Sequence, residues 1–205
     1  MKKLLFLLVL IFGLIGCSYQ EYIPVVLKGE VGNNVSIATK PITSEDSIDV
    51  YFSKQNQHPE IYLNSLIDSS AKTLDIATYG LTYPSTVQAI VNAKKRGVIV
   101  RVVSDKQQSG GETQKHAINI LLLNNILVKI DSHSGLMHLK MTIVDEQVAT
   151  TGSYNYTTNA TDNNDEMLVI IDNADFVRKC LIEFNRMWND DTHYTYANYH
   201  IKGER

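Results

Sequence analysis

Two basic side chains in the C-terminal half of the sequence are spaced so that they can act together on a phosphate. His138 and Lys140 are two residues apart, and on a β-strand such residues point to the same face. Ser153 and Asn155 follow the next predicted strand and can bring a hydroxyl and an amide to the same place. A neutral imidazole can attack phosphorus, while the ammonium, hydroxyl and amide hold the nonbridging oxygens as their negative charge increases. The pattern therefore predicts phosphodiester chemistry.

Such chemistry needs a second imidazole, because the leaving oxygen must receive a proton. The pattern around His138 occurs once, so the simplest arrangement is a homodimer with a shared active site, each subunit giving His138 and Lys140. No spacing of cysteine, histidine and carboxylate residues indicates a zinc site, and we expect neither a metal nor a cofactor. The other histidines have no comparable context: His58, His116, His133, His193 and His200.

The longer pattern His138-x-Lys140-x4-Asp145-x6-Gly152-Ser153 resembles the signature of the phospholipase D superfamily. Five identities at fixed spacing arise by chance in a chain of this length about once in 10,000 sequences. Further similarity, over about residues 48 to 190, is to the small single-motif bacterial endonucleases of that superfamily. It includes the stretches 93–98, 152–157 and 186–188 and the acidic pair Asp165-Glu166.

The resemblance implies a role for each matching residue. His138 is the nucleophile or the general acid, and Lys140 binds phosphate. Ser153 and Asn155 complete the phosphate-binding site, and Ser153 can also orient the histidine. These four residues are the core of the predicted catalytic set.

The same resemblance adds two acidic residues to the set. Asp145 is implied to be structural, tying down a tight turn at Asp145-Glu146, and not to act directly. Glu166 is implied to accept a hydrogen bond from the other imidazole nitrogen, which fixes the tautomer. We favour Glu166 over Asp165 because it shares a strand face with Leu168 and Ile170.

The activity implied is a metal-independent phosphodiesterase that forms a phosphohistidine, with DNA or RNA as substrate. The alternative is a phospholipase D that acts on phospholipid head groups, and a third possibility is a binding lipoprotein without turnover. The chain has a formal charge of −3, and without Lys2 and Lys3 its 17 basic residues face 22 acidic ones, a charge of −5. The basic footprint usual for nucleic-acid binding is therefore absent globally, and phosphate affinity must be local.

The N-terminus has the features of an export signal. A basic start at residues 1–3 precedes an apolar run from Leu4 to Ile15, which is too short to span a bilayer as an ordinary helix. Its ending, Leu14-Ile15-Gly16-Cys17, resembles the lipobox of bacterial lipoproteins, and a plain secretory signal is the alternative. The resemblance implies removal of 1–16, lipid on Cys17, and an exported, membrane-anchored protein on the periplasmic or cell-surface side.

The remaining sequence predicts an α/β fold with a mixed, largely parallel β-sheet flanked by helices. We expect a tether over 17–46, a phospholipase D-like catalytic domain over 47–190 and a frayed tail over 191–205 in preference to a base-stacking surface. Cys180 lies on the apolar face of the last helix and should be a buried, inert thiol. The predicted strands are 31–38, 48–52, 73–79, 98–104, 127–130, 141–144, 147–151 and 167–171. The predicted helices are 60–71, 84–96, 112–124 and about 173–188.

Overall fold

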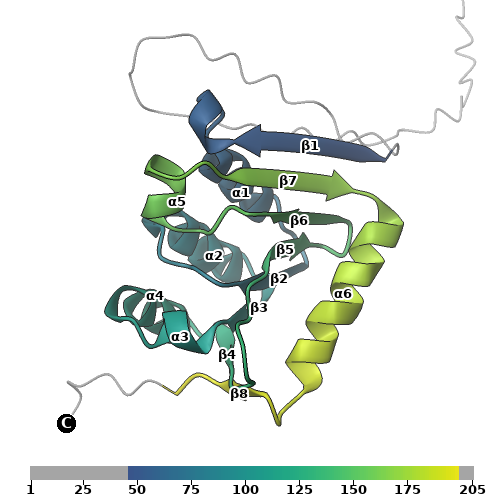
Figure 1. Cartoon of the computed structure of the whole chain (residues 1–205). Helices are drawn as coiled ribbons and strands as arrows, with labels where there is room; N and C mark the ends of the chain where they lie inside the picture. The colour runs from purple at the N-terminus through teal and green to yellow at the C-terminus, as the bar shows by residue number, and fades with distance from the viewer. Residues whose placement is uncertain (1–45, 199–205) are drawn as a thin grey trace, which may run out of the picture. The chain divides into compact units, whose positions relative to one another are not determined.

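The computed structural model describes residues 46–198 (Figure 1). The lipobox, the tether before residue 46, the predicted strand at 31–38 and the last seven residues lie outside this part. An eight-stranded sheet with the order β1-β7-β6-β5-β2-β3-β4-β8 runs through the described residues. Its strands are β1 (Ser47–Phe52), β2 (Thr73–Thr78), β3 (Ile99–Ser104), β4 (Leu127–Asp131), β5 (Lys140–Val144), β6 (Val148–Gly152), β7 (Met167–Asp172) and β8 (Tyr194–Tyr196).

Helices cover both faces of this sheet. Their bounds are α1 (Pro59–Asp68), α2 (Pro84–Lys95), α3 (Lys106–Ser109), α4 (Glu112–Leu123), α5 (Thr158–Asp162) and α6 (Ala174–Asn189), with a 3-10 turn η1 (Ser53–Gln55). Helices α1, α2 and α4 lie on one side, where they share a core with the sheet, and α6 packs on the other (Figure 1). Within residues 46–198 no helix is long and apolar enough to cross a membrane.

The α/β class and the mixed sheet are confirmed, but the expectation of a largely parallel sheet is wrong. Of the seven strand pairings in the described region, β2–β3 and β3–β4 are parallel and the other five are antiparallel. The strand-helix-strand rhythm needed for parallel crossovers holds only from β2 to β4, through α2 and α4. After β4 the connections include a tight β5–β6 turn, which can join only antiparallel strands.

The predicted frayed tail is also corrected. Tyr194–Tyr196 forms β8, which pairs antiparallel with β4. Tyr194 is buried against α6, and the buried Lys129 ammonium lies 4.9 Å from the centroid of the Tyr196 ring. Packing of tyrosines against the preceding helix and against a strand far away in sequence therefore orders a segment whose polar composition gives no strand signal.

The register brings several strand ends to one edge of the sheet. Lys140, the first residue of β5, lies opposite Thr78 at the end of β2. Gly152, the last residue of β6, lies opposite Leu168 near the start of β7. The segments that follow β2 and β6 and precede β5 and β7 therefore meet there, and they carry most of the predicted site residues.

Candidate active site

His138 and Lys140 meet at this edge. His138 lies in the extended segment just before β5 and is exposed, whereas Lys140 is buried, with 7% of its surface accessible. The Lys140 ammonium nitrogen lies 3.0 Å from Nδ1 and 3.1 Å from Nε2 of His138, and it donates a hydrogen bond of 2.8 Å to the His138 carbonyl oxygen. The imidazole and the ammonium thus share one small volume, as their spacing predicts.

Tyr79, which sequence reasoning missed, lies beside both groups. Its ring centroid is 4.5 Å from that of His138 and 5.1 Å from the Lys140 ammonium nitrogen. Its backbone N–H donates to the Leu139 carbonyl oxygen at 2.9 Å, and its hydroxyl accepts a hydrogen bond of 2.9 Å from Gln108. The only sequence signal for Tyr79 is its position at the carboxyl end of a predicted strand.

Burial and two carboxylates shift the pKa of Lys140 in opposite directions. Burial is the larger effect and lowers the pKa of Lys140, because the charged form loses hydration. The negative charges of Glu166 and Asp105 raise that pKa in partial compensation. The site therefore holds a poorly hydrated cation at which a phosphate oxygen would find a strong counter-charge.

Glu166 is buried and the neighbouring Asp165 is exposed, so the structure supports the choice between them. The hydrogen bond expected from His138 to Glu166 is absent from the described part of the chain. The Glu166 carboxylate instead accepts from the Asn164 amide at 2.9 Å, and the Lys140 ammonium lies against both ring nitrogens of His138. Glu166 is therefore not bonded to His138 in this structure, and its negative charge raises the pKa of Lys140.

Ser153 and Asn155 follow β6, as predicted. Ser153 is exposed, and its hydroxyl accepts a hydrogen bond of 3.1 Å from the Met167 N–H. The Asn155 side-chain oxygen is buried and has no hydrogen-bond partner, which costs about 1–3 kcal/mol and suits a group that a ligand would satisfy. A Cβ placed on Gly80 would lie 3.4 Å from that of Asn155, so Asn155 packs against the residue that follows Tyr79.

Asp145 lies at the other end of β5. It occupies the tight turn to β6 with a φ of +51°, and its carboxylate accepts hydrogen bonds of 2.9, 2.7 and 2.8 Å from the backbone N–H groups of residues 71–73. Five residues of strand separate it from Lys140 by about 16 Å. Asp145 therefore holds the turn in place, in agreement with its implied structural role. It is too far from Lys140 to take part in the reaction directly.

Two other residues singled out in the sequence lie apart from the reacting groups. Cys180 is a buried free thiol in the core beneath α6, and burial raises its pKa, so an inert thiol is the better description. His133 pairs with Asp131 at 3.1 Å and not with His138. In the part of the chain that the structure describes, no group of three or more histidine, cysteine or acidic side chains could hold a metal ion.

Comparison with known proteins identifies the family. Residues 63–188, more than half of the chain, match the family model described as "Cardiolipin synthase, PLD-like domain". The chain belongs to this phospholipase D-like family. Both His138 and Lys140, as well as Ser153, Asn155 and Glu166, lie inside the matched range. The resemblance read from the signature is thereby confirmed.

Relatives within the phospholipase D superfamily include enzymes named for lipid substrates. Human mitochondrial cardiolipin hydrolase is 36% identical over 136 residues, which cover 65% of this chain and 53% of that protein. Phospholipase D of Rickettsia conorii is 29% identical over 120 residues, covering 58% of this chain and 59% of the relative. The chain thus spans about half to three fifths of the length of these two relatives.

The whole of one solved structure matches a part of this phospholipase D-like chain. Nuc from Salmonella typhimurium, a phospholipase D family member, superposes with a TM-score of 0.70 and 30% sequence identity. The match covers 76% of this chain and 100% of Nuc. The fold of the described residues is therefore that of a small member of the superfamily.

Proposed function

We propose that this protein is a phosphodiesterase that cleaves nucleic acid through a phosphohistidine on His138. The contact between the exposed imidazole and the buried Lys140 ammonium carries the proposal, because it sets a nucleophile and an anion-binding cation about 3 Å apart. A family of hydrolases that act on phosphodiester bonds supplies independent support.

The reaction has two displacements at phosphorus. In the first, the neutral His138 ring forms an N–P bond, the P–O bond to the leaving group breaks, and a second imidazole gives its proton to the departing oxygen. In the second, that imidazole takes a proton from water, the water oxygen bonds to phosphorus, and the N–P bond breaks. Lys140, Asn155 and Ser153 hold the nonbridging oxygens in both steps, where developing charge is greatest.

The second imidazole is proposed to come from a second copy of the chain. Edge strand β1 supports this assembly, because alternate residues form an exposed apolar stripe: Ile48, Val50 and Phe52, with exposed fractions of 66%, 39% and 39%. Tyr51 stacks on Tyr62 of α1, so the stripe faces the opposite side of the sheet. Phe52 pairs with Met167, and the Met167 N–H donates to the Ser153 hydroxyl, so the Phe52 end of the stripe lies near the site. A symmetric partner covering it would place two sites close together.

Nucleic acid is preferred as substrate because the whole of the small protein Nuc matches this chain, and because the sequence resembles the single-motif endonucleases. The competing substrate is phospholipid. Two observations favour it: relatives are named for cardiolipin and phospholipid, and two leucines near His138, Leu136 and Leu139, are 46% and 38% exposed. Exposed leucines at a catalytic edge suit acyl chains or a lipid surface.

Parallel assays in the presence of a chelator test the proposal. Purified protein is incubated with DNA, RNA and phospholipid vesicles, and nucleic-acid fragments and released head groups are measured. Fragments formed by wild type but not by His138→Ala support the nuclease. Head-group release with nucleic acid left intact selects the phospholipase. The matched control is His116→Ala, which removes an exposed imidazole of α4 and should leave cleavage unchanged. No turnover on any substrate would favour a binding lipoprotein.

Export and lipid attachment at Cys17 are proposed from the N-terminal sequence. Metabolic labelling with a radioactive fatty acid tests them directly, with Cys17→Ser as the unlabelled control. Absence of label in the wild-type protein, together with recovery in the medium, would favour the plain secretory signal.

A further inference from the structure

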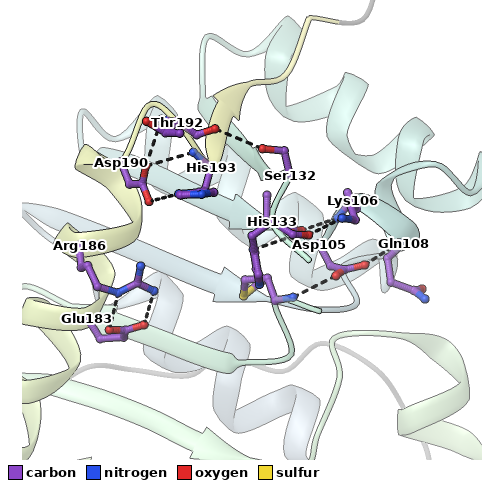
Figure 2. A network of polar contacts seen from close by, with 12 residues as sticks. Asp105, Lys106, Gln108, Ser132, His133, Glu183, Arg186, Asp190, Thr192 and His193 are labelled. Carbon is purple, nitrogen blue, oxygen red and sulfur yellow. Dashed lines mark hydrogen bonds and ion pairs between the residues drawn. The ribbon is translucent and has the colours of Figure 1, made fainter. Parts of the chain in front are cut away.

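The segment that carries His138 is fastened to neighbouring elements at both of its ends (Figure 2). Near its start, the Ser132 N–H donates to the His193 carbonyl oxygen at 2.7 Å, in the turn that leads to β8. The Lys106 ammonium bonds to the His133 carbonyl oxygen from the first turn of α3. Near its end, the Met137 N–H donates to Asp105 at 3.1 Å, one residue before His138. The nucleophile therefore projects from a segment with fixed ends.

Asp105 makes the contact that lies nearest to His138. It follows β3 and is fully buried. One carboxylate oxygen caps α3 by accepting from the Gln108 N–H at 2.9 Å, and the other accepts from Met137. The side chain of the same Gln108 donates to the Tyr79 hydroxyl at 2.9 Å, and the Tyr79 ring packs on His138. The Asp105 carboxylate is thus connected to His138 in two ways, through the Met137 backbone and through Gln108 and Tyr79.

We propose that Asp105 is a positioning residue of this active site. Through Met137 it fixes the backbone of His138. Through Gln108 it fixes Tyr79, on which the His138 ring packs. The inference rests on the proposed phosphodiesterase function. An N-cap alone does not require a charge, because serine, threonine and asparagine cap helices as well as aspartate does. A fully buried carboxylate is costly unless it is paired or hydrogen-bonded, so its presence here fits a second task.

That second task is the hydrogen bond to Met137, and the negative charge of Asp105 also acts on Lys140. The charged or titratable groups around this ammonium are His138 on its own segment, Tyr79 after β2, Glu166 before β7 and Asp105 after β3. The Asp105 charge raises the pKa of Lys140 against the lowering caused by burial. Loss of the charge should therefore lower the pKa of Lys140 further.

The variant Asp105→Asn in the full-length chain tests both routes, since it keeps the size of the side chain and removes its charge. One carboxamide oxygen cannot replace two carboxylate oxygens, so either Met137 or Gln108 loses its acceptor. We expect kcat to fall about 10- to 100-fold with KM changed by less than about threefold, because a misplaced nucleophile slows the chemical step. The alkaline limb of the kcat/KM profile should move to lower pH. A suitable probe is bis(p-nitrophenyl) phosphate, which favours neither nucleic acid nor lipid.

A second readout does not depend on turnover. Chain labelled with ε-13C lysine reports the Lys140 titration by NMR, with Lys140→Arg used to assign the signal, and Asp105→Asn should lower its midpoint. The matched control is Asp75→Asn, which removes a buried carboxylate that is paired with Arg101 at 2.6 Å on the same sheet. It should lower the melting temperature without changing kcat or the Lys140 midpoint.

The outcomes separate the two proposals. An Asp105→Asn protein that keeps the wild-type kcat, whether or not it loses stability as Asp75→Asn does, overturns the positioning role, and a wild-type Lys140 midpoint overturns the electrostatic effect on Lys140. A wild-type protein that never turns over phosphodiesters overturns the proposed function, and the NMR titration then still decides whether Asp105 acts on Lys140.

Discussion

Gly152, which immediately precedes Ser153, offers a sharp test of why the signature contains a glycine. It ends β6 with a φ of +134°, a conformation that residues with a Cβ rarely adopt. A Cβ at this position would lie 2.1 Å from the Met167 carbonyl oxygen. That oxygen already accepts hydrogen bonds of 3.0 and 3.2 Å from the N–H groups of Ser153 and Tyr154. The β6 and β7 backbones therefore have no room for a methyl group here.

The magnitude of Gly152→Ala follows from these contacts. The backbone conformation alone should cost about 1–3 kcal/mol. Relief of the overlap requires β6 and β7 to separate, which stretches two hydrogen bonds worth about 1 kcal/mol each. We expect the free energy of unfolding to fall by about 3–5 kcal/mol, a large part of the ~5–15 kcal/mol typical of a domain. Displacement of Ser153 should also reduce kcat in the protein that remains folded.

Urea unfolding of Gly152→Ala and Gly97→Ala separates strain from overlap. Gly97 has a φ of +96°, but no atom lies within 4 Å of the position of its Cβ. Gly97→Ala should therefore show only the conformational cost and leave kcat unchanged. Equal losses of stability in the two variants would refute the argument that the close approach of β6 and β7 demands Gly152.

Three further predictions follow from the same geometry. Asp145→Ala removes three hydrogen bonds and should lower the free energy of unfolding, measured in urea, by about 2–4 kcal/mol. The kcat of the folded protein should stay unchanged, and a large loss of kcat would contradict the structural role of Asp145. Because burial lowers the pKa of Lys140 and the charged form binds phosphate, kcat/KM should fall as pH rises through a value below that of ordinary lysine. Lys140→Arg should abolish that alkaline limb, and a limb that persists would assign it to another group. Ending the chain after Asn189 removes the buried Tyr194 and should lower the melting temperature by about 10 °C, measured by circular dichroism; an unchanged melting temperature would show that β8 adds no stability.

The arrangement of the site was predictable where the residues are close in sequence. His138 and Lys140 meet because two-residue spacing on extended backbone places side chains together, and Glu166 is distinguished from Asp165 by the same alternation. Asp145 was predicted to tie down a turn, and the sequence also indicated the strands on either side of it. Local periodicity and spacing carry such information directly.

Contacts between distant segments were not predictable. Tyr79 and Asp105 join the site only because β2 and β3 are parallel neighbours and β5 pairs with β2, which no local pattern reveals. The hydrogen bond expected between Glu166 and His138 is absent for a different reason, since each group contacts a side chain two residues away, Asn164 and Lys140 respectively. The strand β8 depends on Lys129 and α6, so its own short sequence could not predict it.

The negative net charge of the chain does not conflict with phosphate chemistry once the position of Lys140 is considered. Charges on the surface are screened by salt within about 8–10 Å, so 22 acidic residues spread over a chain weaken binding of a distant phosphate only slightly. A cation on a buried side chain would interact with an adjacent phosphate at a lower effective dielectric constant. The negative charges of Glu166 and Asp105 partly offset the lowering of the Lys140 pKa by burial. In the proposed site phosphate affinity depends on local groups such as Lys140, so global charge is a poor guide to whether a phosphodiester would bind there.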